Sequence, residues 1–161
     1  MVLRTVILCL AALPTHAEIY SFCWAGSGGY TVTGTMEVPD IGLVTQDDVT
    51  AFTITGWHDG VRIGSWDLSE LTPNTSWVLS FDTRTMSFPM GGDVGSYQAW
   101  NAGGGADDCG TPGFGFNAGN NAQDICLDDT WITDSMVDRD RPLLAVEGRE
   151  VPDCFAVPLL G

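Results

Sequence analysis

The sequence predicts an all-β protein: an antiparallel β-sandwich or flattened barrel of about eight short strands, held by two disulfides. Three observations support this fold class. Short runs of β-branched and aromatic residues alternate with turn residues at roughly ten-residue spacing. Apolar residues spaced for a helix are scarce. Four cysteines follow an N-terminal segment typical of exported proteins, in which disulfides persist.

Residues 1–17, MVLRTVILCLAALPTHA, are predicted to be a cleaved signal peptide. Arg4 precedes an apolar run that ends at Pro14, and the small-residue pattern around Ala17 suits a signal peptidase. The apolar run is shorter than the roughly 20 residues of a membrane helix. We therefore expect a single β-sandwich domain over residues 18–161, secreted or periplasmic, with no membrane insertion after cleavage.

The chain is strongly acidic. It has 21 acidic residues against six arginines and no lysine, which gives a formal net charge of −15. Such a charge repels nucleic acid and anionic lipid, so neither is expected as a partner. Apolar residues make up 44% of the sequence, which is enough to form a core and argues against a disordered chain.

After loss of Cys9 with the signal, the even number of cysteines predicts two disulfides, for which three pairings are open. Pairing Cys109 with Cys126 closes a short loop, and Cys23 with Cys154 then joins the two ends of the domain. The alternative, a four-cysteine zinc site, lacks any Cys-x-x-Cys motif.

The turns predict three hairpins. Two have clear turn chemistry, at Gly26-Ser27-Gly28-Gly29 and at His58-Asp59-Gly60, and the third turns at residues 82–85. The strands expected around these turns are residues 19–26, 28–38, 49–57, 61–68, 76–81 and 86–90. Further strands are expected at residues 125–127, 131–133 and 143–148, and short helices near residues 67–71 and 134–138.

The stretch GFGFNAGNNAQDIC, residues 113–126, contains glycines at the spacing of a nucleotide-binding loop. Its flanks are neither an apolar strand nor an amphipathic helix, and it lies between Cys109 and Cys126. We therefore interpret it as a glycine-rich loop closed by a disulfide. In this interpretation Phe114 and Phe116 pack inward, and residues 117–121 form an exposed turn.

Catalytic patterns are weak. His58 is the one histidine outside the signal, it lies in a predicted turn, and no Gly-x-Ser-x-Gly motif is present. Among the many acids, Glu37 and Glu70 are the best placed on regular structure for a glycosidase-like pair. A secreted hydrolase therefore remains an alternative, with no catalytic residues assigned.

Calcium is the best metal candidate, through clustered aspartates in the second half of the chain. The main candidates are Asp107, Asp108, Asp128 and Asp129, with Asp124 and Asp134 nearby. They lack the spacing of an EF-hand loop. A solvated acidic surface is the favoured interpretation, so no cofactor is expected.

Six tryptophans are many for this chain length. Sugar-binding β-sandwiches use exposed indole rings, because one face of a pyranose is apolar. Trp57 and Trp100 each lie beside a turn or a glycine-rich segment and are expected to be the exposed pair. Extracellular polysaccharide or surface matrix is the partner that this pattern indicates.

Three segments, GGYTVTGTM, WDLSEL…WVLSFDTRTMSF and GFGFNAGNN…IC, together with the signal peptide, resemble a group of small exported bacterial proteins of unknown function. Many of those proteins carry a PEP-CTERM-type sorting segment, which this sequence lacks. The resemblance implies export, a β-rich fold and surface or matrix association. The predicted function is thus an exported, non-catalytic surface, matrix or binding module, with a carbohydrate-binding module and a secreted hydrolase as alternatives.

Overall fold

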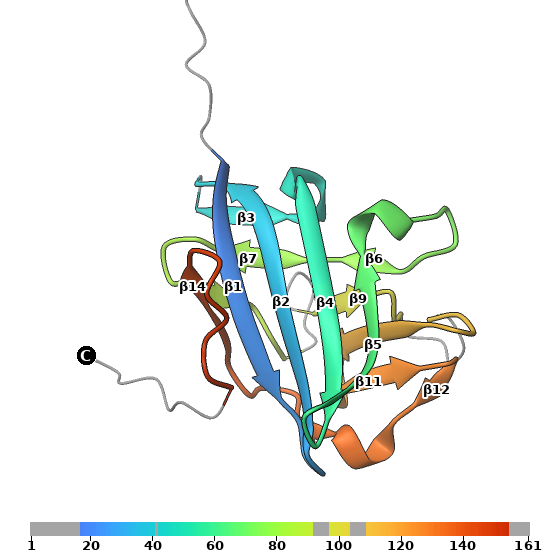
Figure 1. The fold of residues 1–161 in the computed structure, drawn as a ribbon. Helices are drawn as coiled ribbons and strands as arrows, with labels where there is room; N and C mark the ends of the chain where they lie inside the picture. Colours follow the sequence, from blue (N-terminus) through green and yellow to red (C-terminus); the bar gives the residue numbers. More distant parts are fainter. Residues whose placement is uncertain (1–16, 41, 92–96, 104–108, 155–161) are drawn as a thin grey trace, which may run out of the picture.

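The computed structural model describes residues 17–40, 42–91, 97–103 and 109–154, which form two antiparallel sheets around one aromatic core (Figure 1). The predicted all-β fold class and both predicted disulfides, Cys23–Cys154 and Cys109–Cys126, are confirmed. The predicted signal peptide lies outside the described residues except for Ala17. No helix in the described part of the chain is long and apolar enough to cross a membrane.

The first sheet has eight strands and curves into a half-barrel, in the order β3-β7-β8-β14-β1-β2-β4-β5. Their bounds are β1 Ala17–Ala25, β2 Tyr30–Pro39, β3 Leu43–Thr45, β4 Ala51–His58, β5 Val61–Asp67, β7 Ser80–Asp82, β8 Ser87–Phe88 and β14 Leu143–Glu147. The β1–β2 and β4–β5 hairpins are where the sequence predicts them. Asp59 and Gly60 have φ of 49° and 78°, as the mirror-image turn of a two-residue hairpin requires.

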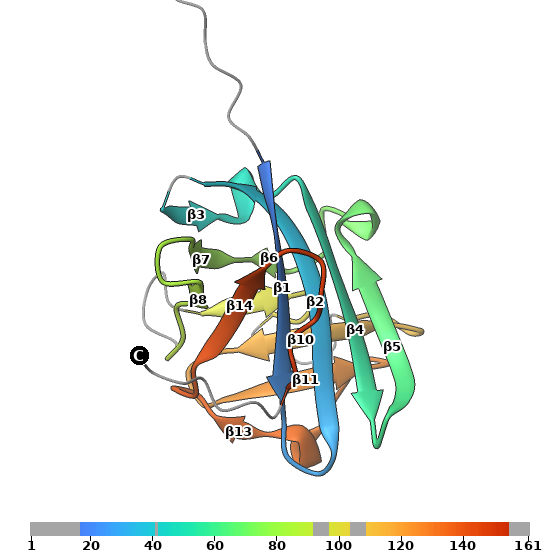
Figure 2. The same ribbon diagram turned by 60° about the vertical axis from the view of Figure 1, so that its left-hand side comes forward.

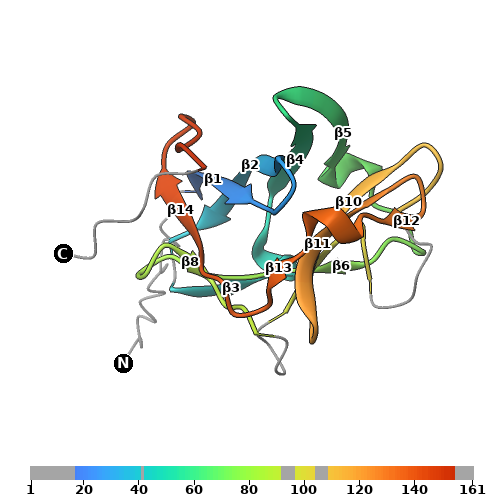
Figure 3. The same cartoon turned by 90° about the horizontal axis from the view of Figure 1, so that it is seen from below.

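The second sheet packs across the first and follows the order β12-β11-β10-β9-β6, with β13 also paired to β11 (Figures 2 and 3). Its strands are β6 Trp77–Val78, β9 Gln98–Trp100, β10 Phe114–Ala118, β11 Ala122–Leu127, β12 Thr130–Trp131 and β13 Val137–Asp138. Three short 3-10 helices connect the strands: η1 Gln46–Asp48, η2 Leu68–Glu70 and η3 Thr133–Ser135.

Two strand predictions are wrong in an instructive way. The predicted strand over residues 76–81 is two strands in different sheets, β6 and β7, because the chain crosses between the layers at the buried Leu79. The glycine-rich stretch over residues 113–126, expected as a loop, contains β10 and all of β11 except its last residue. Its anchors Phe114 and Phe116 are 1% and 0% exposed, so their predicted inward packing is confirmed.

Phe114 joins the second sheet to the first. Its ring lies against Gly56 of β4 and Gly64 of β5, and a Cβ built on Gly64 would come within 2.7 Å of the Cβ of Phe114. The inward-facing positions of β4 and β5 that contact the Phe114 ring are therefore glycines, because a larger side chain there would clash with the ring. The two glycines bring the edge of the first sheet against β10.

Candidate functional site

The side of β1, β2, β4 and β5 that points away from the core carries three cross-strand rows, which we call the outer face. The register aligns Ser21, Thr35, Thr53 and Asp67 in one row, Cys23, Thr33, Thr55 and Ser65 in the next, and Ala25, Thr31, Trp57 and Arg62 in the third. Adjacent strands are about 4.8 Å apart, and same-face residues along a strand about 6.7 Å. On β1, Ser21 and Ala25 are buried and Cys23 is in the disulfide with Cys154. The accessible hydroxyl groups of the outer face are therefore those of β2, β4 and β5, beside one indole ring.

Trp57 is the aromatic side chain of the outer face. It is half-buried, and its Nε1 donates a hydrogen bond of 3.0 Å to Thr33 Oγ1 on the neighbouring strand β2. Because Thr33 lies on the same face, this bond holds the indole across the sheet. Because the side chain is only half-buried, part of the indole is accessible to a ligand.

Polar side chains of the outer face are held by contacts with one another. The hydroxyls of Thr35 and Thr53 are 3.0 Å apart, and the Arg62 guanidinium donates to Ser65 Oγ. Threonine and serine hydroxyls both donate and accept, so these groups can match the hydroxyls of a sugar.

The expectation that Trp100 is exposed is wrong. Trp100 is 0% exposed and contacts Phe22, Phe52 and Phe116, with ring centroids 4.7–5.3 Å apart. It lies on β9 and points into the core, because β9 pairs with β10 and places Phe116 directly opposite Trp100. Trp24 and Trp66 are also buried, and Trp77 and Trp131 are half-buried.

The loop over residues 109–113 is fixed by contacts from the β11–β12 turn. Asp128 Oδ1 accepts from the Gly113 amide at 3.0 Å, and the Asp129 carboxylate accepts from the Gly110 amide and the Thr111 hydroxyl. The Cys109–Cys126 disulfide ties the same loop to β11. The interpretation of a disulfide-closed segment is therefore correct, but much of it is the hairpin β10–β11.

The predicted exposed turn over residues 117–121 is too long. Asn117 and Ala118 belong to β10, Ala118 is buried, and the exposed residues of this turn are Asn120 and Asn121. Strand pairing continues further because Ala118 is paired with Gln123 across the hairpin and with Gln98 on β9. A phosphate-binding helix follows none of the three glycines, since β10 and β11 run through the whole stretch.

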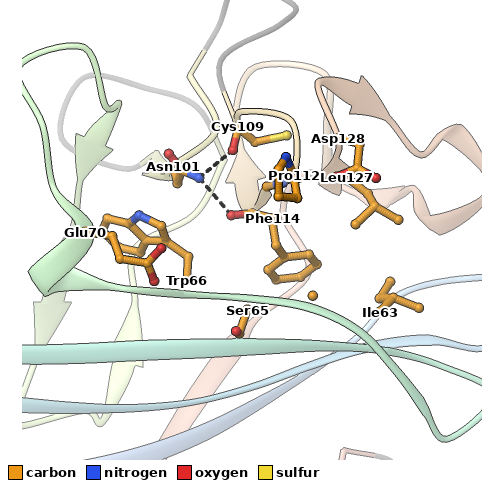
Figure 4. Close-up of a pocket in the computed structure, with 12 residues that line it drawn as sticks. Ile63, Ser65, Trp66, Glu70, Asn101, Cys109, Pro112, Phe114, Leu127 and Asp128 are labelled. Carbon is orange, nitrogen blue, oxygen red and sulfur yellow. Dashed lines mark hydrogen bonds between the residues drawn. The ribbon is translucent and has the colours of Figure 1, made fainter.

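A pocket of about 270 Å³ opens between β5 and the 109–113 loop (Figure 4). Asn101, which is 8% exposed, forms its back: its Nδ2 donates to the carbonyls of Cys109 and Phe114, each at 2.9 Å. In Figure 4, Trp66 and Glu70 lie on one side, and Leu127 and Asp128 lie on the other. No sequence pattern predicts this pocket, because its walls come from segments far apart in the chain.

The catalytic candidates are not brought together. The His58 ring stacks on Tyr30 with centroids 4.1 Å apart, and its Nε2 is 3.7 Å from Asp59 Oδ2. Glu37 is half-buried on β2, while Glu70 is exposed and accepts from the Asp67 amide as a helix cap. The described residues therefore form no pair of buried acids that could flank a glycosidic bond.

Asp124 is the one buried acid among the described residues. It faces away from the core on β11, and its Oδ1 has no hydrogen-bond partner. Burial raises the pKa of this carboxyl to about 6, and a hydrogen bond from Asn117 opposes the shift. The pair sits directly across the β10–β11 register.

The calcium candidates are only partly within the described residues. Asp107 and Asp108 lie outside them, and Asp128 and Asp129 bind the 109–113 loop as described above. No group of three or more histidine, cysteine or acidic side chains gathers among the residues that the structure describes.

Comparison of the chain with protein-family models, with curated proteins and with solved structures gives no match. The resemblance to small exported bacterial proteins stays a prediction.

Proposed function

We propose that this chain is an exported, non-catalytic binding module whose outer face binds a neutral or basic polysaccharide of the cell surface or surrounding matrix. Export is supported by the predicted signal peptide and by two disulfides, which persist outside the reducing cytoplasm. The observation that carries the binding proposal is Trp57, held across β2 by its bond to Thr33.

The chemistry of the outer face suits a sugar chain. A pyranose ring stacks its apolar face on an indole and directs its hydroxyls sideways. The neighbouring rows offer threonine and serine hydroxyls at regular strand spacing, and these can exchange hydrogen bonds with successive sugar units. The net charge of −15 repels anionic polymers, which is why we propose a neutral or basic chain.

A secreted hydrolase gains no comparable support. The two acids that line the pocket beside β5, Glu70 and Asp128, are both exposed and each accepts from a backbone amide, and His58 lies at the end of β4 against Tyr30.

The test is sedimentation of the folded protein with insoluble cellulose, xylan, chitin and chitosan. W57A is expected to lower the affinity for the bound polysaccharide by at least about tenfold, because truncating a central aromatic removes a large share of binding energy. W57F keeps a stacking ring but loses the bond to Thr33, and should retain part of the affinity.

The matched control is Y97A, which removes another aromatic ring, 38% exposed, that precedes β9 in the second sheet. Its binding should equal that of the wild type. Equal loss in W57A and Y97A, or no loss in W57A when its unfolding curve is unchanged, would contradict the proposal.

A further inference from the structure

The pocket beside β5 has a wall that is built before any ligand arrives. The 109–113 loop is tied by a disulfide, by the Asp128 carboxylate and by the two hydrogen bonds from Asn101. Asn101 adopts φ of 53°, a conformation that asparagine tolerates better than most residues. Such a wall does not have to be ordered on binding, which removes part of the cost of association.

The lining combines an apolar floor with carboxylates. Apolar contacts come from Ile63, Trp66, Pro112, Phe114 and Leu127. Two acids, Glu70 and Asp128, stand on opposite sides in Figure 4, and no lysine or arginine is among the described residues that line the pocket.

Both carboxylates keep acceptor capacity for a ligand. Glu70 uses Oε1 for the Asp67 amide, and Asp128 uses Oδ1 for the Gly113 amide. Each ionised carboxylate has about four lone-pair sites, so the second oxygen of each can accept from a bound donor.

We propose that this pocket binds a small organic cation: a compact, partly apolar body that carries a protonated amine. The amine is attracted by the two carboxylates and by the negative field of the whole chain, while the carbon body covers Ile63 and Leu127. An anionic ligand meets only repulsion here. This site is distinct from the outer face that is proposed to bind polysaccharide, and W57A leaves it intact.

The volume of the pocket and the exposure of its two carboxylates determine the affinity that we expect for the amine. A volume of about 270 Å³ admits a single six-membered ring with its substituents. Because Glu70 and Asp128 are both exposed, each ion pair is partly screened, and we expect a Kd of about 1 mM.

The experiment is an NMR titration of the full chain with cyclohexylamine hydrochloride and glucosamine hydrochloride, each against its neutral counterpart, cyclohexanol and glucose. Sodium chloride keeps the ionic strength constant. The reporters are the Asn101 side-chain amide, the Gly113 amide and the Trp66 indole N–H, which line the pocket. The amines are expected to shift these signals, and the neutral compounds at least about fivefold more weakly.

E70Q and D128N are the informative variants. Glutamine can still accept from the Asp67 amide and asparagine from the Gly113 amide, and asparagine suits the positive φ of Asp128, so both variants should fold. Each is expected to weaken amine binding about threefold to fivefold, and the double variant about tenfold or more. D47N removes one exposed charge outside the pocket and should bind as the wild type does.

Three results overturn the proposal: no shift at amine concentrations up to about 50 mM, equal binding of the neutral compounds, or an equal loss in D47N. Stronger binding of glucosamine than of cyclohexylamine would show a preference for amino sugars, and the reverse order a preference for more apolar amines. Either order supports the cation site.

Discussion

The outer face and the region around the 109–113 loop are stabilised by different means. The outer face stands on long, regular strands: β1 and β2 pair over nine residues and β2 and β4 over eight, with core side chains alternating against hydroxyl-bearing ones. The loop region has short strands and depends on a disulfide, on aspartate side chains that cap backbone amides, and on Phe114 wedged against two glycines. The outer face is specified by the alternation of apolar and polar residues along its strands, and the loop region by a few individual contacts.

This difference has a functional meaning. A regular surface can present repeated hydroxyl groups to an extended polymer, whereas an irregular, fastened loop can enclose a small pocket. The contrast also predicts where single substitutions cost most: around Phe114 and the loop, rather than on the outer face.

Phe114→Ala should have the largest effect. The ring is 1% exposed and fills the space above Gly56 and Gly64, so its loss leaves a cavity between the two sheets. The expected decrease in the free energy of unfolding is about 3–5 kcal/mol, measured by denaturant titration. A loss below about 1 kcal/mol would show that β10 does not depend on this contact.

Removal of the Cys109–Cys126 disulfide should rank second. The C109S/C126S variant loses a link across 17 residues, which the chain-entropy treatment values at about 3 kcal/mol. Hydrogen exchange should accelerate in β10 and β11 and remain slow in β2 and β4. Uniform acceleration through both sheets would contradict the separation of the two regions.

Asp124→Asn should stabilise the protein in a pH-dependent way. Burial raises the pKa of this carboxyl above its unfolded value, so the folded state binds the proton more tightly. The stability that comes from protonated Asp124 is therefore fully present below about pH 4. It is lost as the pH rises through about 6, and this loss lowers the free energy of unfolding by up to about 3 kcal/mol. Asparagine does not titrate, so the free energy of unfolding of D124N does not decrease over this pH range for this reason.

The measurement is the difference in unfolding free energy between D124N and the wild type from pH 4 to pH 8. It should grow in favour of D124N over this range and level off above about pH 7. A difference that is constant with pH would mean that Asp124 titrates alike in the folded and unfolded chains.

The regular region could be predicted from the sequence, and the irregular one could not. Apolar and polar residues alternate in β2 and β4, and Asp59-Gly60 favours a tight turn. Both patterns reflect local backbone preferences that the folded structure retains. The same local rules failed at Leu79, where the chain changes sheets, and at Trp100, whose burial depends on aromatic partners from distant strands. Nothing near Trp100 in the sequence reports those partners.

The candidate sites divide in the same way. Trp57 was predicted as an exposed aromatic beside a turn, and it lies half-buried on the outer face. The pocket was missed because Glu70, Asn101 and Asp128 meet only through the packing of Phe114 on β5. A useful signal was available in the pair Gly56 and Gly64, since glycines facing inward on adjacent strands indicate close approach of another element.

The most direct test of polysaccharide binding by the outer face is the response of the six tryptophan indole N–H signals to soluble cello-, xylo- and chito-oligosaccharides. If the outer face binds polysaccharide, the Trp57 signal shifts in a saturable way with at least one of these sugars, while the signal of the buried Trp100 does not move. Saturable shifts confined to Trp77 or Trp131, or no shift of Trp57 with any of the three, would contradict a polysaccharide-binding outer face.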